Sequence, residues 1–285
     1  MAGPLHIRQL VPSDLDFADS LRELAGWNQT LGDWRRFLAL QPGGCFLAQW
    51  DGAPAGTATT LSYGTELSWI GMVLVQPKYR RRGIARALVL RCLEYLREGG
   101  AQCIKLDATP EGQLVYAQLG FKEEWSWRRW EANPRPREDC PPIGLRPWKE
   151  ADALAFAEED ARAFGASRQE LLRALGRESC AALAHDAEKG AMNGYGMARR
   201  GAKALYLGPV SATAATAGLS LIAALTAGGE GSVLWDIPDS NVVATEWAQR
   251  HGFRPRRKLT RMWLGEQNRP GDPLRQFALA GPELG

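Results

Sequence analysis

A short basic stretch, Tyr79-Arg80-Arg81-Arg82-Gly83-Ile84-Ala85, has the residue types and spacing of an anion-binding loop. It directly follows an apolar run and precedes a segment with helical periodicity. Backbone N–H groups in such a turn and in the first helical turn have no partner within the helix, and with the helix dipole they attract phosphate. Gly83 lets a ligand approach the backbone, and the small Ala85 serves the same purpose. The stretch predicts a phosphate or pyrophosphate site, with a solvated basic turn as the alternative.

The surrounding pattern predicts the elements that hold this loop. Residues 69–75 are an unbroken apolar run, as expected for a strand covered on both faces. From Gly83 onward apolar residues recur every three to four positions, and Gly99-Gly100 ends the predicted helix. Three further elements follow along the chain. They are a strand at 103–106, a helix around 113–119 and a strand near 125–130. Their order indicates a mixed α/β fold.

The two halves of the chain resemble each other, which indicates an internal duplication. Near the start of each half an arginine is followed six positions later by an aspartate, and two glycine-containing motifs recur. The paired segments are 6–14 with 144–152, 56–58 with 194–196, and 120–121 with 252–253. The proline-dense segment between the halves favours extended backbone. We therefore expect a first domain over 1–133, a Pro-rich linker over 134–142 and a second domain over 143–285.

The composition is that of an ordinary globular protein and excludes several classes. The length of 285 residues favours two domains. The formal net charge of +3 gives no large basic surface for binding nucleic acid. Five scattered cysteines without a C-x-x-C pair predict reduced thiols rather than a disulfide framework. None of the three histidines has metal-ligand spacing, so no metal is expected. No signal peptide or membrane span is visible, and we expect a cytoplasmic protein.

Two motifs occur together in the first half. Arg80, Gly83 and Ala85 stand between a strand and a helix, and Tyr116-Ala117-Gln118-Leu119-Gly120-Phe121 follows downstream. They resemble the Gln/Arg-x-x-Gly-x-Gly/Ala and Tyr-x-x-x-Gly-Phe motifs of the acetyl-CoA-dependent N-acetyltransferases of the GNAT superfamily. The resemblance covers nearly the whole chain and implies a tandem GNAT acyltransferase fold. It assigns to acetyl-CoA, the co-substrate, residues Met72, Val73, Leu74, Val75, Arg80, Arg81, Arg82, Gly83, Ile84 and Ala85.

The second half resembles the same superfamily but lacks the anion-binding loop. After its apolar strand at 204–210, residues 211–213 include no basic residue and no Gly-x-Gly/Ala pattern. Ala248 stands where Tyr116 stands in the first half. We therefore expect a degenerate second copy that does not bind acetyl-CoA and that shapes the acceptor cleft. Asp236 and Asp239 of this copy are interpreted as turn residues, with a contact to a cationic acceptor as the alternative.

The resemblance implies direct transfer of the acetyl group to a bound amine. In that family the pantetheine arm pairs with the strand before the loop, and a backbone N–H polarises the thioester carbonyl. Tyr116 would protonate the departing thiolate, because a phenol with a pKa near ~10 stays protonated at neutral pH. The alternative for Tyr116 is a packed core residue. A general base must also take a proton from the amine.

Two carboxylates are candidates for contact with the amine. Glu66, just upstream of the strand that would bind the cofactor, is the best candidate for the general base, and a solvent-facing loop carboxylate is an equally good interpretation. Asp107 lies at the end of a strand, where it either orients a substrate ammonium or caps the following turn. Capping is favoured for Asp107.

The function expected from these motifs is N-acetylation of a small-molecule or peptide amine by a monomer or homodimer, without nucleic-acid or membrane partners. A non-catalytic acyl-CoA-binding sensor or interaction module would use the same loop without acetyl transfer. A nucleic-acid-binding module would use the basic runs 80–82 and 254–258, which lack an interleaved aromatic platform. The sequence leaves the acceptor amine open, because acceptor sites lie in variable loops.

Overall fold

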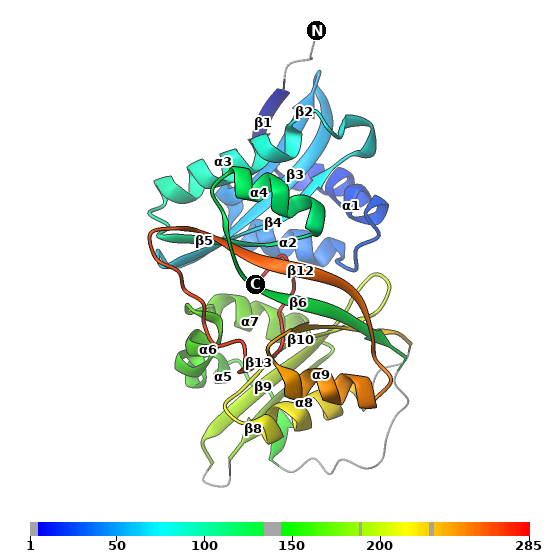
Figure 1. Ribbon diagram of the computed structural model, residues 1–285, viewed down its shortest axis with the longest axis vertical. Coiled ribbons are helices and arrows are strands. Elements are labelled where there is room, and N and C mark those ends of the chain that lie inside the picture. Colours follow the sequence, from blue (N-terminus) through cyan, green and yellow to red (C-terminus); the bar gives the residue numbers. More distant parts are fainter. Residues whose placement is uncertain (1–4, 134–143, 188–189, 228–230) are drawn as a thin grey trace.

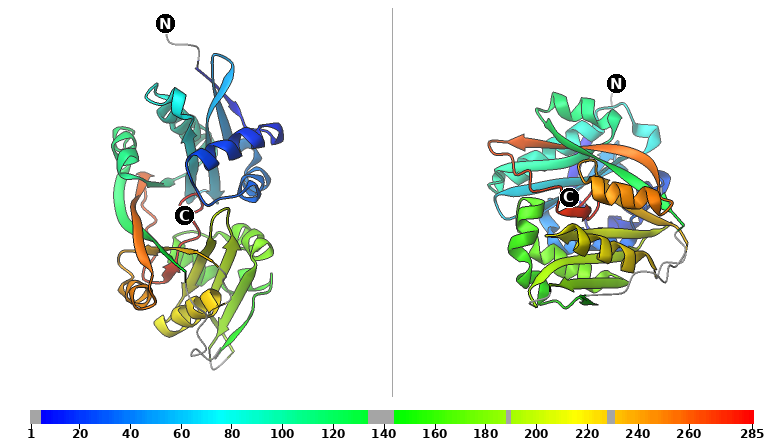
Figure 2. Two further views of the ribbon diagram at one scale, coloured as in Figure 1. Left: turned by 90° about the vertical axis from the view of Figure 1, so that its right-hand side faces the viewer. Right: turned by 60° about the horizontal axis from the view of Figure 1, so that its bottom comes forward.

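The computed structural model describes residues 5–133, 144–187, 190–227 and 231–285. The expected linker at 134–142 lies outside these residues. The first repeat forms the upper part of the molecule in Figure 1 and the second repeat forms the lower part. The C-terminal end of the chain lies between the two parts in both views of Figure 2.

The first repeat has the element order that its sequence predicts. Its strands are β1 (Leu5–Gln9), β2 (Cys45–Trp50), β3 (Ala53–Tyr63), β4 (Leu67–Val75), β5 (Cys103–Ala108) and β6 (Lys122–Ala132). Its α-helices are α1 (Leu15–Leu24), α2 (Leu31–Leu40), α3 (Ile84–Glu98) and α4 (Pro110–Gln118). The predicted strand, loop, helix, strand, helix and strand from position 69 onward correspond to β4 through β6. The mixed α/β class is confirmed.

The second repeat follows the same order with shorter first helices. Its strands are β7 (Leu145–Pro147), β8 (Ala181–Asp186), β9 (Met192–Arg200), β10 (Leu205–Ala212), β11 (Val233–Pro238), β12 (Arg254–Gly265) and β13 (Gln276–Ala278). Its α-helices are α5 (Asp152–Ala155), α6 (Ala157–Phe164), α7 (Gln169–Glu178), α8 (Ala215–Ala227) and α9 (Val242–Arg250). No helix within the described residues is both long and apolar enough to cross a membrane.

The two repeats exchange their last long strands within one continuous sheet. The strand order is β1-β2-β3-β4-β5-β12-β6-β11-β10-β9-β8-β7, with β13 beside β10. β12 is antiparallel to both β5 and β6, and β6 is antiparallel to β11. Figure 1 shows β12 and β6 crossing together between the upper and lower parts. Each repeat is therefore completed by a strand of the other, and a boundary at 133 separates the repeats along the chain but not across the sheet.

The duplication is visible as the same ion pair in both repeats. Arg8 donates to Asp14 through Nη1 and Nη2, each at 2.7 Å. Arg146 donates to Asp152 in the same way, at 2.8 and 2.9 Å. Bidentate guanidinium–carboxylate pairs fix both distance and orientation. The matching segments 6–14 and 144–152 thus hold the first strand of each repeat to the start of the helix that follows.

Two apolar clusters cover the opposite faces of β4. The cluster beneath α3 includes Ile70, Ile84, Leu88, Cys92, Ile104 and Phe121. The cluster on the other face joins α1 and α2 to the second repeat. It includes Leu21, Trp34, Phe37, Trp69, Met72, Phe164 and Leu284. β4 is therefore buried on both faces, as its unbroken apolar run predicts, and one of its faces contributes to the contact between repeats.

Candidate active site

The predicted anion-binding loop lies between β4 and α3 and leaves space for a ligand. Gly83 is the N-cap residue of α3, with φ of 79° and no side-chain cap. A Cβ added at Gly83 would meet no atom within 4 Å. The N–H groups of the first turn of α3 have no intrahelical partner and face this open space. The residues at this position therefore fit a phosphate or pyrophosphate group.

The three arginines of the loop have different surroundings. Arg80 Nε donates to the Val75 carbonyl at 3.2 Å, which closes the loop onto the end of β4. The Arg82 guanidinium lies 5.1 Å from the ring centroid of Trp50 and 5.9 Å from that of Tyr79. All three arginines are exposed. Their three positive charges directly precede Gly83 along the chain and attract an anion to the loop.

β4 carries a bulge and separates from β5 before it reaches the loop. The register between β3 and β4 shifts after Thr57, and Met72 has φ of 50°. Thr57 Oγ1 donates to the Met72 carbonyl at 3.0 Å and holds the bulge. In the described part of the chain β4 pairs with β5 only at 68–69. The edge at 70–75 therefore offers backbone groups to an additional extended chain.

Tyr116 lies on α4 in the apolar cluster beside this edge. The cluster also contains Val73, Val75 and Ile84. Burial, with a smaller effect of Cys92, raises the pKa of the Tyr116 hydroxyl to about 12. The phenol is therefore protonated at neutral pH. Tyr116 therefore belongs to the same apolar cluster as three residues that the motifs assign to acetyl-CoA.

Glu66 lies at the other end of β4. It belongs to the turn between β3 and β4, its side chain is 51% exposed, and its Oε1 lies 3.4 Å from Arg269 Nη2. The strand between Glu66 and Met72 spans about 20 Å at about 3.3 Å per residue. The structure does not bring Glu66 together with Tyr116 or the bulge. The assignment of Glu66 as general base stays a prediction without geometric support.

Asp107 has a role that neither sequence interpretation describes. Its side chain is fully buried and accepts from Arg261 of β12, with Nε–Oδ1 at 3.0 Å and Nη2–Oδ2 at 3.1 Å. The Arg261 guanidinium also lies over the Trp69 and Trp125 rings, 4.5 and 4.2 Å from their centroids. Capping and substrate contact are both wrong for Asp107, because its carboxylate ties the exchanged strand β12 to β5.

The two aspartates singled out in the second repeat also bind arginines of β6. Asp236 is a buried strand residue that accepts from Arg129 Nε at 2.7 Å and from Arg129 Nη2 at 2.5 Å. Asp239 accepts from Arg128 Nη1 at 2.9 Å. The arginine partners of both aspartates therefore belong to the first repeat of the same chain. The turn interpretation is wrong for Asp236, which lies in β11.

In the second repeat the chain itself fills the gap that corresponds to the β4–β5 opening. β10 pairs in parallel with β11 over 205–207 and then with β13 at Val210 and Ser211. A Cβ added at Gly218, near the start of α8, would come within 2.5 Å of the Phe277 ring of β13. β13 therefore occupies the edge of β10 and the space at the helix start where an external chain would have to bind.

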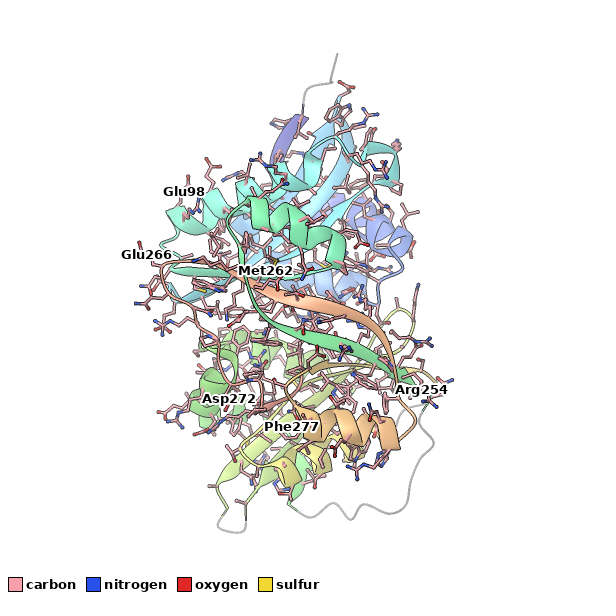
Figure 3. The ribbon with its side chains drawn as sticks, in the orientation of Figure 1. Glu98, Arg254, Met262, Glu266, Asp272 and Phe277 are labelled. Atoms are coloured by element: carbon pink, nitrogen blue, oxygen red, sulfur yellow. The ribbon has the colours of Figure 1, made fainter. Side chains whose placement is uncertain are left out.

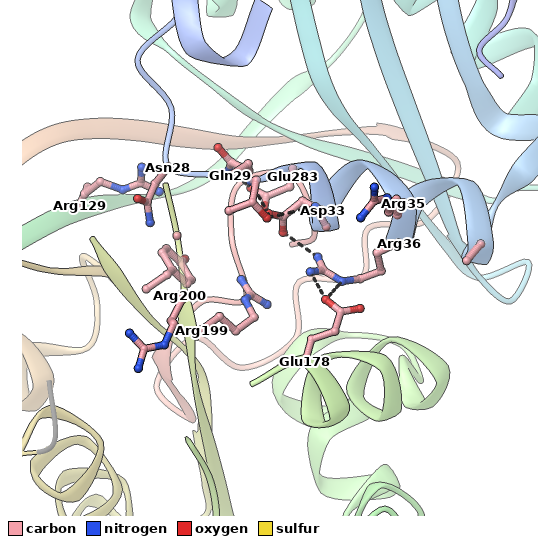
Figure 4. Close-up of a pocket in the computed structure, with 15 residues that line it drawn as sticks. Asn28, Gln29, Asp33, Arg35, Arg36, Arg129, Glu178, Arg199, Arg200 and Glu283 are labelled. Carbon is pink, nitrogen blue, oxygen red and sulfur yellow. Dashed lines mark hydrogen bonds and ion pairs between the residues drawn. The ribbon is translucent and has the colours of Figure 1, made fainter. Parts of the chain in front are cut away.

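A cavity of about 520 Å³ lies between the repeats, on the α2 side of the sheet (Figure 4). Charged side chains from both repeats line it. They are Asp33, Arg35, Arg36, Arg129, Glu178, Arg199, Arg200 and Glu283. Arg36 donates to Asp33 at 2.9 Å and to Glu178 of α7 at 2.9 Å, which bridges the repeats. Sequence analysis missed this site, because its residues come from separate elements and form no local motif.

Comparisons with known proteins agree with this geometry. A family model described as the acetyltransferase (GNAT) family matches residues 15–121, and one described as an acetyltransferase (GNAT) domain matches 157–278. The chain is 30% identical to the uncharacterized N-acetyltransferase YitH of Bacillus subtilis over 188 residues, 66% of each protein.

Solved structures share the fold over almost the whole chain. A Pyrococcus horikoshii protein provisionally described as an acetyltransferase has a TM-score of 0.85 and 24% identity, covering 99% of this chain and 96% of its own. A tandem GNAT protein from the clavulanic acid biosynthesis pathway has a TM-score of 0.66 and 18% identity, covering 93% of this chain and 100% of its own. At these identities the two structures are evidence for the fold alone.

Proposed function

The chain belongs to the GNAT family of acetyltransferases and carries two copies of its fold, and we propose that it transfers an acetyl group from acetyl-CoA to a primary amine. One observation carries the proposal. The first repeat combines an open helix N-terminus at Gly83, a stretch of β4 that is unpaired on its β5 side, and a protonated phenol at Tyr116 in the apolar cluster that also contains Val73, Val75 and Ile84. No such combination occurs in the described part of the second repeat, where β13 fills the corresponding gap.

The residues of the first repeat fit acetyl-CoA. The N–H groups at 83–85 and the arginines at 80–82 would hold the pyrophosphate, and the free edge at 72–75 would hold the pantetheine arm. When bound, acetyl-CoA supplies a thioester carbon that an amine can attack. Backbone N–H groups of β4 would stabilise the negative charge that develops on the carbonyl oxygen.

Tyr116 acts as the acid in this proposal. Direct transfer forms the bond between the amine nitrogen and the acetyl carbon while the carbon–sulfur bond breaks. The Tyr116 hydroxyl donates its proton to the departing sulfur and is reprotonated from solvent. Because burial raises the pKa of Tyr116 to about 12, the phenol keeps its proton throughout the neutral range.

Calorimetric titration with acetyl-CoA tests the division of labour between the repeats. We expect one site per chain, in the first repeat. Two sites would overturn the assignment of the second repeat to the acceptor side, and absence of binding would overturn the proposal. If acetyl-CoA binds tightly but none of the amines tested causes thiol release, a non-catalytic acyl-CoA sensor would be favoured.

Replacing Tyr116 with phenylalanine should lower kcat about 100-fold, because the leaving thiolate loses its proton donor. The Kd for acetyl-CoA should stay within about twofold, since the ring and its packing remain. Thiol release and calorimetry measure the two quantities. Tyr95→Phe is the matched control, because Tyr95 lies on α3 and its hydroxyl accepts a hydrogen bond from Gln41 Nε2 at 2.8 Å. Full turnover in Tyr116→Phe would contradict the assignment of the acid.

We also propose that the acceptor is a small-molecule or peptide amine rather than a nucleic acid. The basic run 254–258 is partly neutralised, because Arg256 Nε lies 2.6 Å from Glu131 and Lys258 Nζ lies 4.0 Å from Asp239. A DNA or RNA shift assay should show weak binding without a steep salt dependence.

A further inference from the structure

We propose that the cavity between the repeats is the acceptor site, and that it takes an amine that also carries an anionic group. The Glu283 carboxylate receives the proton of the ammonium, and Arg199 binds the anion. This inference rests on the proposed acetyltransferase function, and its test separates the two.

The position of Glu283 connects the cavity to β4. Its backbone packs on Gly71, the residue before the bulge at Met72. A Cβ added at Gly71 would lie 2.8 Å from the Glu283 carbonyl oxygen and 2.9 Å from its Cα. Two aromatic side chains hold the neighbouring carbonyls, with Trp69 Nε1 2.9 Å from the Pro282 oxygen and the Tyr63 hydroxyl 2.6 Å from the Leu284 oxygen.

The cavity and Tyr116 therefore lie on opposite sides of β4. Residues around Glu283 belong to the apolar cluster that joins the repeats, whereas Tyr116 belongs to the cluster beneath α3. An amine in the cavity would approach the unpaired edge of β4 from one face. Tyr116 would protonate the leaving sulfur from the other face. This arrangement separates the base from the acid. The amine nitrogen loses its proton on one face of β4, and the sulfur gains a proton on the other face.

The surroundings of Glu283 suit a base. Its Oε2 accepts from Gln29 Nε2 at 2.6 Å. Burial is the largest influence and raises the pKa of the Glu283 carboxyl, Asp33 raises it further, and Arg199 and Gln29 lower it. The Glu283 charge in turn raises the pKa of four further groups around it, which are Tyr63, Arg129, Tyr206 and Arg257. A carboxylate with a raised pKa accepts a proton from an ammonium more readily than an ordinary one.

Arg199 supplies an anion site inside the cavity. The residue is only 8% exposed, and its Nη2 donates to the Ala280 carbonyl at 2.6 Å. Its Nη1 is buried and has no acceptor within the described residues. Buried guanidinium N–H groups are normally hydrogen-bonded, and a ligand oxygen would satisfy this one. Figure 4 shows Arg199 of β9 on the side of Asp33 and Arg36 of α2, whereas the Arg200 guanidinium points away from α2.

The charge balance of the lining selects the ligand class. Five arginines and three carboxylates line the cavity. Arg36 forms ion pairs with both Asp33 and Glu178, and Arg129 pairs with Asp236, which stands beside the lining. Five arginines therefore face four carboxylates, a net charge of +1. Within the described residues Arg35, Arg199 and Arg200 form no ion pair, and neither does Glu283. One base beside an excess of positive charge matches an amine that also carries a carboxylate or phosphate group. The cavity volume of about 520 Å³ lies within the range of roughly 300–1,000 Å³ that is usual for small-ligand sites.

Matched amines test the ligand class on the full chain. The probes are glycine and glycinamide, L-lysine and L-lysinamide, and O-phosphoethanolamine and ethanolamine. Calorimetry without acetyl-CoA measures binding, and thiol release measures transfer. At least one probe that carries an anionic group should bind at least tenfold more tightly than its partner that lacks this group, and the carboxylate and phosphate pairs distinguish the two sources of the anion. Equal binding within every pair would overturn the inference.

Arginine variants test the anion site. Arg199→Gln should weaken binding of the preferred probe with an anionic group about 10- to 100-fold, the usual range for a lost charged hydrogen bond, and should leave binding of the partner without that group unchanged. Arg200→Gln, at an exposed position that tolerates substitution, should weaken binding of the same preferred probe several-fold. Arg254→Gln is the control, since Arg254 is exposed at the start of β12 and does not line the cavity (Figure 3). Unchanged discrimination in both cavity variants would contradict the anion site.

Glu283→Gln tests the base. The amide keeps the shape of the carboxyl and its contact with Gln29, so kcat should fall at least 100-fold and the acidic limb of its pH profile should disappear. Loss of kcat in Glu66→Gln but not in Glu283→Gln would return the base to Glu66 and overturn this part of the inference. Failure of the wild-type chain to bind acetyl-CoA would instead overturn the proposed function. Acetyl-CoA binding with no discrimination among the amine pairs would overturn only the inference.

Discussion

Gly83→Val is expected to abolish acetyl-CoA binding, with at least a 100-fold rise in Kd. Gly83 has φ of 79°, a conformation that a β-branched residue adopts only at a cost of about 1–3 kcal/mol. The added side chain would also enter the open space in front of α3, where no atom lies within 4 Å of a Cβ. Phosphate oxygens need that space to reach the backbone N–H groups. Calorimetric titration with acetyl-CoA measures the effect.

Gly52→Val separates the two causes. Gly52 lies in the exposed turn between β2 and β3, has φ of 77°, and has no atom within 4 Å of an added Cβ. The variant therefore carries a similar backbone strain without blocking the loop. It should lose stability as Gly83→Val does and should bind acetyl-CoA like the wild type. Wild-type affinity in Gly83→Val would exclude the loop as the pyrophosphate site.

The predictions that the structure confirms are those that depend on local pattern. The apolar run at 69–75 is a strand because it is buried on both faces, and the change to helical spacing at Gly83 marks the start of α3. The arginine and aspartate repeated at the start of each half form the same bidentate pair. In these cases the residues that specify the structure are neighbours in the sequence.

Long-range pairing could not be read from the sequence in the same way. Strand periodicity sets which face is buried but not which strand lies alongside, so the exchange of β6 and β12 has no local signature. The sequence around Asp107 points only to the turn that follows it, whereas its partner Arg261 lies on the exchanged strand β12. Glu283 had no recognisable motif, because its position comes from packing on Gly71 and from its contact with Gln29.

Asp236→Ala is expected to lower the free energy of unfolding by about 3–5 kcal/mol, the range for a buried ion pair that loses one partner. Asp236 of β11 lies directly opposite Arg129 of the exchanged strand β6. The Asp236 side chain is fully buried and that of Arg129 is 8% exposed. The carboxylate accepts both guanidinium bonds and the Tyr206 hydroxyl at 3.0 Å. Without it, a charged guanidinium stays buried between the repeats and lacks an acceptor.

Asp239→Ala provides the matched control for this prediction. Asp239 directly follows β11 and pairs with Arg128 of β6, but the side chains are 25% and 43% exposed, so the loss should stay within about 1 kcal/mol. Urea denaturation followed by circular dichroism compares both variants with the wild type. The double variant Asp236→Leu with Arg129→Met should recover much of the stability, because it removes both buried charges and keeps the volume. Equal losses in Asp236→Ala and Asp239→Ala would show that the exchanged strand is held by its backbone pairing and packing rather than by the buried pair.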